Sequence, residues 1–180
     1  MKTASFKLFG KNIVSTFNHH IMSLNYSSHT ENNNLIMECI TDQPEKMIDG
    51  TYSTGTAKSL LLKNKGKCDV FIFHDSDKNV VGTLSVMYKN GKDIEYRIRN
   101  ADAFIYNVLT VPKYRGKGYA GEMLRLLSDY LHRKSIDKAY LAVSTNNISA
   151  IRAYEKVGFQ TEYDLSFIRI LRVNIPYRQL

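Results

Sequence analysis

The segment between residues 103 and 143 constrains the fold most, because it has the order of a buried strand, a glycine-rich turn, a helix and a second strand. Ala103–Val111 is a nearly continuous apolar run, as expected of a central strand covered on both faces, and Pro112 ends its pairing. Ala139–Val143 is a second short apolar run. These segments predict a parallel βαβ unit with a right-handed crossover. The intervening helix has its apolar residues on one stripe: Met123, Leu127, Tyr130 and Leu131.

Antiparallel strands are predicted before this unit. Cys68–His74 and Asn79–Tyr88 are rich in β-branched and aromatic residues and flank a turn-forming run, so they predict a hairpin. After the tight-turn pair Asn90-Gly91, Ile94–Arg99 alternates strictly between apolar and polar residues, which is typical of a half-exposed strand.

A second helix and further strands are predicted after the unit. The helix runs from a favourable N-cap at Asn147 to Lys156, and Gly158 supplies a left-handed stop. Phe159–Val173 alternates enough for one or two antiparallel strands. The predicted fold class is therefore mixed α/β (α+β), with a single sheet flanked by helices.

The first third of the chain gives weaker signals. The polar run Tyr26–Asn34 predicts a loop between an amphipathic stretch and the apolar segment Leu35–Ile40. Asp42–Asp49 and Thr56–Leu62 have compositions that allow short helices. We therefore expect a less regular N-terminal third.

The net charge of +8 is concentrated in the second half of the chain, where all nine arginines lie. Such a surplus favours an anionic partner. The alternatives are nucleic acid, membrane headgroups and a phosphorylated cofactor. No stretch reaches the ~18 apolar residues of a membrane span, and the N-terminus lacks the apolar core of a signal peptide. We therefore expect a cytoplasmic protein.

Cysteine and histidine spacing argues against a metal site. Cys39 and Cys68 form no CxxC pair, so we expect both to be reduced, and buried rather than reactive. The five histidines lack the spacing of a ligand set and are expected on the surface or in loops: His19, His20, His29, His74 and His132.

The run Lys113–Gly121 places glycines and basic residues between the predicted strand and helix. The free N–H groups and partial positive charge of a helix N-terminus attract anions, and glycines let a phosphate approach the backbone. Arg115 and Lys117 add full charges. The spacing fits a dinucleotide fingerprint poorly. Gly50–Ser59 imitates a phosphate-binding P-loop, but its lysine is misplaced and no apolar strand precedes it.

Three motifs resemble those of the GNAT (Gcn5-related) N-acetyltransferases. Arg115–Ala120 (RGKGYA) matches the acetyl-CoA signature R/Q-x-x-G-x-G/A. Asn107–Tyr114 resembles the end of the family's fourth strand, and Asn147–Phe159 resembles its second motif, N-x-x-A-x-x-x-Y-x-K-x-G-F. The resemblance covers residues 68–160 well and residues 1–60 hardly at all. It implies one mostly antiparallel sheet in which a parallel strand pair splays apart to bind acetyl-CoA.

The resemblance also implies roles for individual residues. The CoA pyrophosphate would lie on the N–H groups of Gly116–Ala120, and the pantetheine arm along Leu109–Val111. A backbone N–H near Leu109 would stabilise the oxyanion, and Tyr154 would protonate the departing thiolate. The implied cofactor-binding residues are Leu109, Thr110, Val111, Arg115, Gly116, Lys117, Gly118, Tyr119, Ala120, Asn147 and Tyr154.

The general base is less well defined by the resemblance. Many members of the family have a glutamate where this chain has Asn107, and an amide accepts no proton at neutral pH. Asn107 would then position water or substrate. Glu95 and Tyr106 are the alternatives, together with no base at all if the amine arrives neutral.

The expected function is transfer of an acetyl group from acetyl-CoA directly to a primary amine of a small molecule, such as an amino sugar, a polyamine or an amino acid derivative. The alternatives are a protein or peptide N-acetyltransferase and a catalytically silent CoA-binding module. We expect neither metal nor nucleic acid as a partner, and a homodimer remains open. Residues 1–180 are predicted to form one domain with its motif-bearing core at about 68–173, and residues 1–60 are expected to face the substrate.

Overall fold

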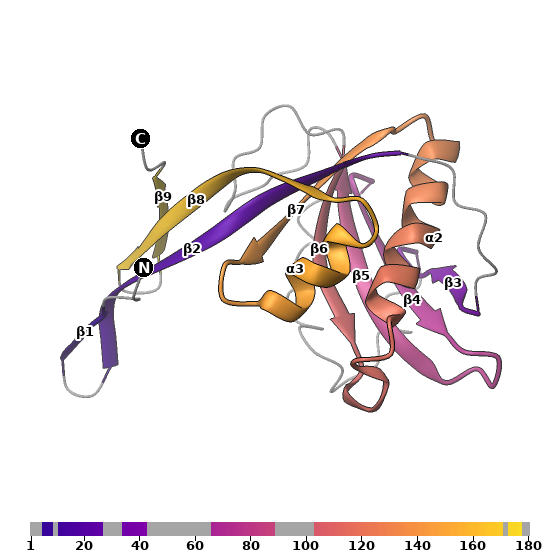
Figure 1. The fold of residues 1–180 in the computed structure, drawn as a ribbon, viewed down its shortest axis with the longest axis horizontal. Coiled ribbons are helices and arrows are strands. Elements are labelled where there is room, and N and C mark those ends of the chain that lie inside the picture. Colours follow the sequence, from indigo (N-terminus) through magenta and orange to yellow (C-terminus); the bar gives the residue numbers. More distant parts are fainter. Residues whose placement is uncertain are drawn as a thin grey trace.

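The computed structural model describes residues 5–8, 11–26, 34–42, 66–88, 103–170 and 173–177. Within these ranges, nine strands form one sheet in the order β3-β4-β5-β6-β7-β2-β8-β9, and β1 pairs with β2 beside this path (Figure 1). All the strand pairs are antiparallel except β6 and β7, which are parallel. The predicted mixed, mostly antiparallel sheet is therefore confirmed. The strands are β1 Ser5–Leu8, β2 Lys11–Asn25, β3 Ile36–Cys39, β4 Cys68–His74, β5 Val80–Tyr88, β6 Ala103–Thr110, β7 Lys138–Ser144, β8 Gln160–Ile170 and β9 Val173–Tyr177.

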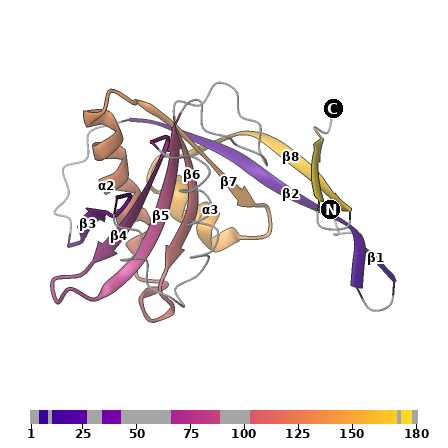
Figure 2. The same cartoon turned by 180° about the vertical axis from the view of Figure 1, so that it is seen from behind.

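Two α-helices pack on the same face of this sheet. They are α2 (Tyr119–Arg133) and α3 (Ile148–Glu155), and a short 3-10 helix, η2 (Pro112–Tyr114), precedes α2. Met123 and Leu127 of α2 and Tyr154 of α3 belong to one buried cluster that includes residues of β5, β6 and β7. Figures 1 and 2 show both helices on one side of β5 and β6. The opposite face carries a second, more aromatic cluster: Ile21, Phe104, Tyr140, Leu165 and Phe167.

The predicted hairpin, βαβ unit, second helix and tail strands form as expected. β4 and β5 make the hairpin, and the Asp75 carboxylate at its turn accepts hydrogen bonds from the backbone N–H groups of Asp77 and Asn79 at 3.0 and 2.8 Å. β8 pairs with β9 in the tail. Gly158, after α3, has a φ of 105°, which a residue without a side chain adopts most easily.

The N-terminal third differs from the prediction of irregular structure. β2 is a strand of 15 residues that lies inside the sheet, between β7 and β8. Two consecutive residues of β2 are fully buried on opposite faces of the sheet. Ile21 lies in the aromatic cluster, and Met22 lies under the helices. A segment buried on both faces, such as residues 21–24, does not alternate between apolar and polar residues, so the sequence gives no clear strand signal there.

The prediction that both cysteines are buried holds for only one of them. Cys39 is exposed, whereas Cys68 is buried as expected and burial raises the pKa of its thiol to about 12. The exposed position of Cys39 follows from the place of β3 at the edge of the sheet.

Three predicted elements cannot be compared with the structure. The strand predicted over Ile94–Arg99, the helix over Thr56–Leu62 and almost all of the helix over Asp42–Asp49 lie outside the described residues.

In the parts of the chain that the structure covers, no helix is both long enough and apolar enough to span a bilayer.

Candidate functional site

The parallel strands β6 and β7 pair over only part of their length. Their register runs from Ala103 opposite Ala139 to Ile105 opposite Leu141, but β6 continues to Thr110 and β7 to Ser144. Beyond Ile105 the two strands are no longer paired with each other, which confirms the predicted splay. The side chains from 106 to 110 are accordingly half-buried rather than covered on both faces, so that part of the strand prediction was wrong. An unpaired strand edge can accept an extended ligand as though it were another strand.

A β-bulge interrupts β6 inside this opening. Ser85 of β5 faces Tyr106 and Thr83 faces Leu109, so β6 has one more residue than β5 between these two pairs. Asn107 within the bulge has a φ of 52°, a left-handed conformation that asparagine tolerates better than most residues. Its side-chain nitrogen Nδ2 is buried and has no hydrogen-bond partner in the part of the chain that the structure describes. The bulge therefore leaves an unused buried donor beside the opening.

Gly82 of β5 lets three elements meet behind the bulge. A Cβ atom at this position would overlap the backbone oxygen of Leu109 and would lie 2.6 Å from Sδ of Met123 in α2. Only a residue without a side chain allows this approach. The path of β6 through the opening therefore depends on Gly82.

The glycine-rich turn between η2 and α2 is exposed and open. Gly116 and Gly118 have φ values of 75° and 85°, and a Cβ atom added at either would meet no atom within 4 Å. Gly118 is the N-cap of α2. Among the described residues, the N–H groups from Gly116 to Ala120 donate no recorded hydrogen bond. Free N–H groups at a helix N-terminus, with Arg115 and Lys117 beside them, have the charge and hydrogen-bond donors that attract an anion.

Tyr114 connects this turn to the β4–β5 hairpin. Its hydroxyl donates a 2.6 Å hydrogen bond to Oδ2 of Asp75, and this bond raises the pKa of Tyr114 and lowers that of Asp75. The Nζ atoms of Lys113 and Lys117 lie 4.7 and 5.8 Å from the centre of the Tyr114 ring. Arg115 donates from Nε to the backbone oxygen of Thr110 at 3.0 Å. The sequence contains no local signal for the Tyr114–Asp75 contact, because the two residues are 39 positions apart.

Tyr154 and Asn147 belong to the helix that follows the open end of β7. The Asn147 side chain caps α3, since Oδ1 accepts hydrogen bonds from the Ala150 N–H at 3.3 Å and from the Ser149 hydroxyl at 3.1 Å. Tyr154 is only 7% exposed, and burial raises the pKa of its phenol to about 12. Its hydroxyl is therefore protonated throughout the neutral range.

The candidates for a general base are not brought together. Glu95 lies outside the described residues, and Tyr106 is half-buried on β6, with its ring 4.4 Å from that of Phe104. Asn107 occupies the bulge. Among the residues that the structure describes, no cluster of histidine, cysteine and acidic side chains could hold a metal ion.

His19 lies near the opening, and sequence reasoning did not single it out. His19 and His20 are partly exposed residues of β2 rather than loop residues, and His19 pairs with Ser144 in the open part of β7. Its ring makes an edge contact with Phe167 at 5.5 Å. Burial, followed by the charge of His20, lowers the pKa of His19, so the ring is neutral at pH 7. Only the strand register, which no local pattern encodes, places it here.

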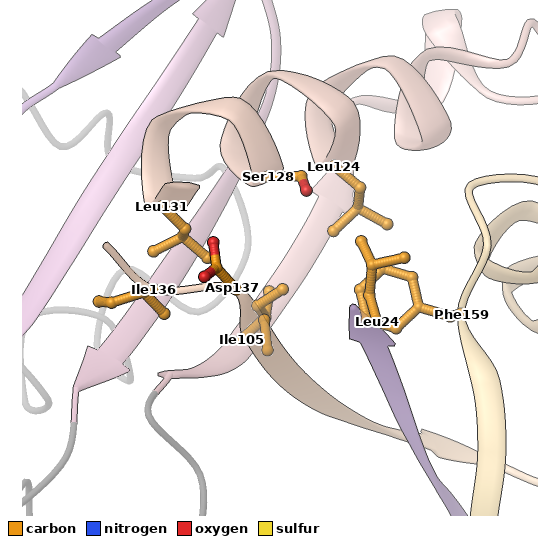
Figure 3. A pocket seen from close by; sticks show the side chains of 9 residues that line it. Leu24, Ile105, Leu124, Ser128, Leu131, Ile136, Asp137 and Phe159 are labelled. Carbon is orange, nitrogen blue, oxygen red and sulfur yellow. The ribbon is translucent and has the colours of Figure 1, made fainter. Parts of the chain in front are cut away.

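The hollow drawn in Figure 3 is not part of this site. It lies between the C-terminal half of α2 and the starts of β6 and β7, where Ile105, Leu131 and Ala139 line it. These residues belong to the main buried cluster. The exposed glycine turn is at the other end of α2, so we regard the hollow as a packing defect of the core.

Several of the known proteins that this chain resembles are N-acetyltransferases. The model of the acetyltransferase (GNAT) family matches residues 35–159. Spermidine N(1)-acetyltransferase of Vibrio cholerae is 29% identical over 93 residues, which are 51% of this chain and 49% of that protein. The [ribosomal protein bS18]-alanine N-acetyltransferase of Escherichia coli is 30% identical over 74 residues, which are 39% of this chain and 50% of that protein.

A solved structure shows the same fold. An acetyltransferase from the GNAT family of Colwellia psychrerythraea superposes with a TM-score of 0.59 at 15% identity, covering 84% of this chain and 54% of that one. The chain spans about half the length of the curated relatives named above. Because the family model matches well over half of the residues, this chain belongs to the acetyltransferase (GNAT) family.

Proposed function

We propose that the protein is an acetyl-CoA-dependent N-acetyltransferase that acts on a primary amine of a small molecule. The observation that carries this proposal is the unpaired edge of β6 and β7 next to the exposed glycine turn at the N-terminus of α2. The edge suits the extended, amide-containing pantetheine arm, and the turn suits a pyrophosphate. Membership of the family supports the same donor.

The donor would occupy a continuous path along these elements. The pyrophosphate would accept hydrogen bonds from the N–H groups between Gly116 and Ala120, with Arg115 and Lys117 compensating its charge. The pantetheine amides would pair with the backbone from Leu109 to Val111, and Asn147 would contact the arm from the opposite side. In this way the cofactor accounts for part of the positive charge in the second half of the chain.

The proposed chemistry is direct transfer. The lone pair of the neutral amine attacks the thioester carbon, and the backbone N–H of Leu109 holds the resulting oxyanion. The C–N bond forms and the C–S bond breaks as Tyr154 donates its phenolic proton to the thiolate sulfur. The ammonium proton of the intermediate passes through water back to the tyrosinate, so the products are the acetylated amine and free CoA thiol. Bringing donor and amine together accounts for much of the rate.

We propose residues 1–180 as one domain, with the N-terminal part next to the acceptor. The family model begins at residue 35, yet β2 pairs with β7 and β8 inside the sheet. β2 places His19 beside the open end of β7. Substitutions in β2 would therefore change acceptor preference.

Polyamines are the first acceptor class to test, because a relative is named a spermidine N(1)-acetyltransferase. The experiment measures thiol release from acetyl-CoA with spermidine, spermine, amino sugars, amino acids and peptides with a free N-terminus. We expect turnover with a small-molecule amine. Turnover with peptides alone would favour the protein-directed alternative, for which the ribosomal-protein acetyltransferase is a precedent. Tight CoA binding without turnover on any amine would contradict the enzyme proposal.

Gly118→Ala is expected to weaken acetyl-CoA binding by about 10-fold or more, since the new methyl group would occupy space that a phosphate oxygen needs. Gly66→Ala is the matched control, because Gly66 has a similar φ of 73° and equally open surroundings but lies before β4. Both variants should lose similar stability. Calorimetric titration with acetyl-CoA separates them, and equal affinities would refute the phosphate assignment.

A further inference from the structure

The bulge in β6 holds a buried hydrogen-bond donor that the proposed mechanism does not use. Nδ2 of Asn107 is buried without a partner in the described part of the chain. A buried donor without an acceptor is costly, and such groups in folded proteins usually have a functional reason. Asn107 also has a φ of 52°, so the backbone is held in a sparsely populated conformation at the same residue.

We propose that the side-chain amide of Asn107 donates a hydrogen bond to the carbonyl oxygen of the acetyl thioester. This inference rests on the proposed function, because it assumes acetyl-CoA as the donor. Asn107 lies two positions before Leu109, in the part of β6 that β7 leaves unpaired. The amide would act as a second oxyanion donor beside the Leu109 N–H.

The charge that develops in the reaction favours this oxygen as the acceptor. An amide nitrogen can only donate, so its partner must present a lone pair. The attacking amine needs its own lone pair for the thioester carbon, and a protonated amine has none. The thioester oxygen has two lone pairs and gains negative charge as the amine adds, so a donor aimed at it strengthens in the transition state.

Asparagine also suits the backbone at this position. Asparagine, aspartate and glycine are the residues that most readily adopt a left-handed conformation. Aspartate would place a negative charge where the oxyanion forms, and glycine would provide no donor. Asn107 therefore combines the bulge conformation with a neutral donor, and the transferred proton must leave by a route other than this side chain.

Two variants separate the side chain from the backbone. Asn107→Gly keeps a residue that favours the positive φ and removes the amide, whereas Asn107→Asp keeps the size and replaces the donor by a carboxylate. Ser135→Gly is the matched control for a new glycine, because Ser135 is exposed beyond the far end of α2 and has a φ of 59°. Melting temperatures show whether each variant is folded.

The first measurement needs no turnover. The thioester oxygen is present in acetyl-CoA and absent from CoA, so Asn107→Gly should weaken acetyl-CoA binding by about 3- to 10-fold and leave CoA binding unchanged, as expected for one hydrogen bond. Ser135→Gly should bind both ligands like the parent protein. An unchanged ratio of the two affinities in Asn107→Gly would overturn the inference even if the protein is an active enzyme.

The second measurement is the pH profile of turnover on the best acceptor. Asn107→Gly should lower kcat by ~10²-fold at every pH, and Asn107→Asp should lower it further through repulsion of the oxyanion. An Asn107→Asp enzyme faster than the parent at neutral pH, where the carboxylate is ionised, would show that this position serves a base and would overturn the inference. If no amine is acetylated while the affinity ratio changes as expected, the proposed function fails and the contact of Asn107 with the acetyl group stands.

Discussion

Replacing Tyr154 by phenylalanine is expected to lower kcat by ~10²- to 10⁴-fold, the range that a general acid contributes. The ring is 7% exposed within the main cluster, so phenylalanine retains its packing and the affinity for CoA should change little. Without the phenol, the thiolate must leave without a proton from the enzyme. Steady-state kinetics with saturating acetyl-CoA measures the loss.

The pH dependence of this loss follows from the raised pKa. Burial raises the pKa of Tyr154 to about 12, so the phenol remains protonated at alkaline pH, where an ordinary tyrosine with a pKa near 10 would ionise. The ratio of parent to variant turnover should therefore be constant from neutral pH to about pH 10. Linkage predicts a second effect. Between pH 10 and pH 12 the unfolded state loses this proton first, so Tyr154 contributes to a loss of stability in the parent protein. The Tyr154→Phe protein should lose less stability over this range, because only the other groups with raised pKa values still contribute.

Tyr140→Phe is the control for this experiment. Tyr140 is also 7% exposed but lies in the aromatic cluster on the other face of the sheet. The same substitution there should leave kcat within about 3-fold of the parent value, since surface and packing changes of this size have small effects. Equal losses in the two variants would mean that Tyr154 acts through the core and not as an acid.

Gly82→Ala is expected to damage both stability and activity. The added methyl group would overlap the backbone oxygen of Leu109 and press on Sδ of Met123 at 2.6 Å. Backbone in a sheet cannot move aside as a flexible side chain can. The loss in free energy of unfolding should therefore reach or exceed the upper end of the range of about 1–3 kcal/mol for overpacking. A displacement of β6 by about 1 Å at the thioester would also lower turnover by ~10²-fold.

Urea unfolding and acetyl-CoA turnover measure these two effects. Gly121→Ala is the control, because a Cβ atom there would lie 3.4 Å from Cγ2 of Val157, an ordinary contact, and alanine favours the helix by about 1 kcal/mol. We expect Gly121→Ala to unfold at the parent urea concentration or above it. If Gly82→Ala unfolded there too, the close approach of β5 and β6 would not be needed.

Much of the site could be predicted from the sequence because its signals are local. The turn Gly116–Ala120 is read from glycines and basic residues within a few positions, and the cap at Asn147 from one residue before a helix. Both lie where they were predicted. Family membership is likewise carried by short motifs, and the matched region, 35–159, contains all of them.

Other parts of the site depend on which strands pair and in which register. Residues 21–24 of β2 are buried on both faces of the sheet and therefore give no alternating pattern, so the insertion of β2 beside β7 and the placement of His19 could not be predicted. The Tyr114–Asp75 hydrogen bond joins turns that are distant in sequence. Neither contact leaves a signal within a window of a few residues.

The sequence by itself determined the βαβ unit, the glycine-rich turn and the family, because each rests on the preferences of neighbouring residues. The tertiary structure alone decided where β6 leaves β7, that the bulge falls on Asn107, and that its amide is buried without a partner. These features depend on how β6 pairs with β5 along one edge and with β7 along the other. That pairing is settled by packing across the whole sheet rather than by local conformation.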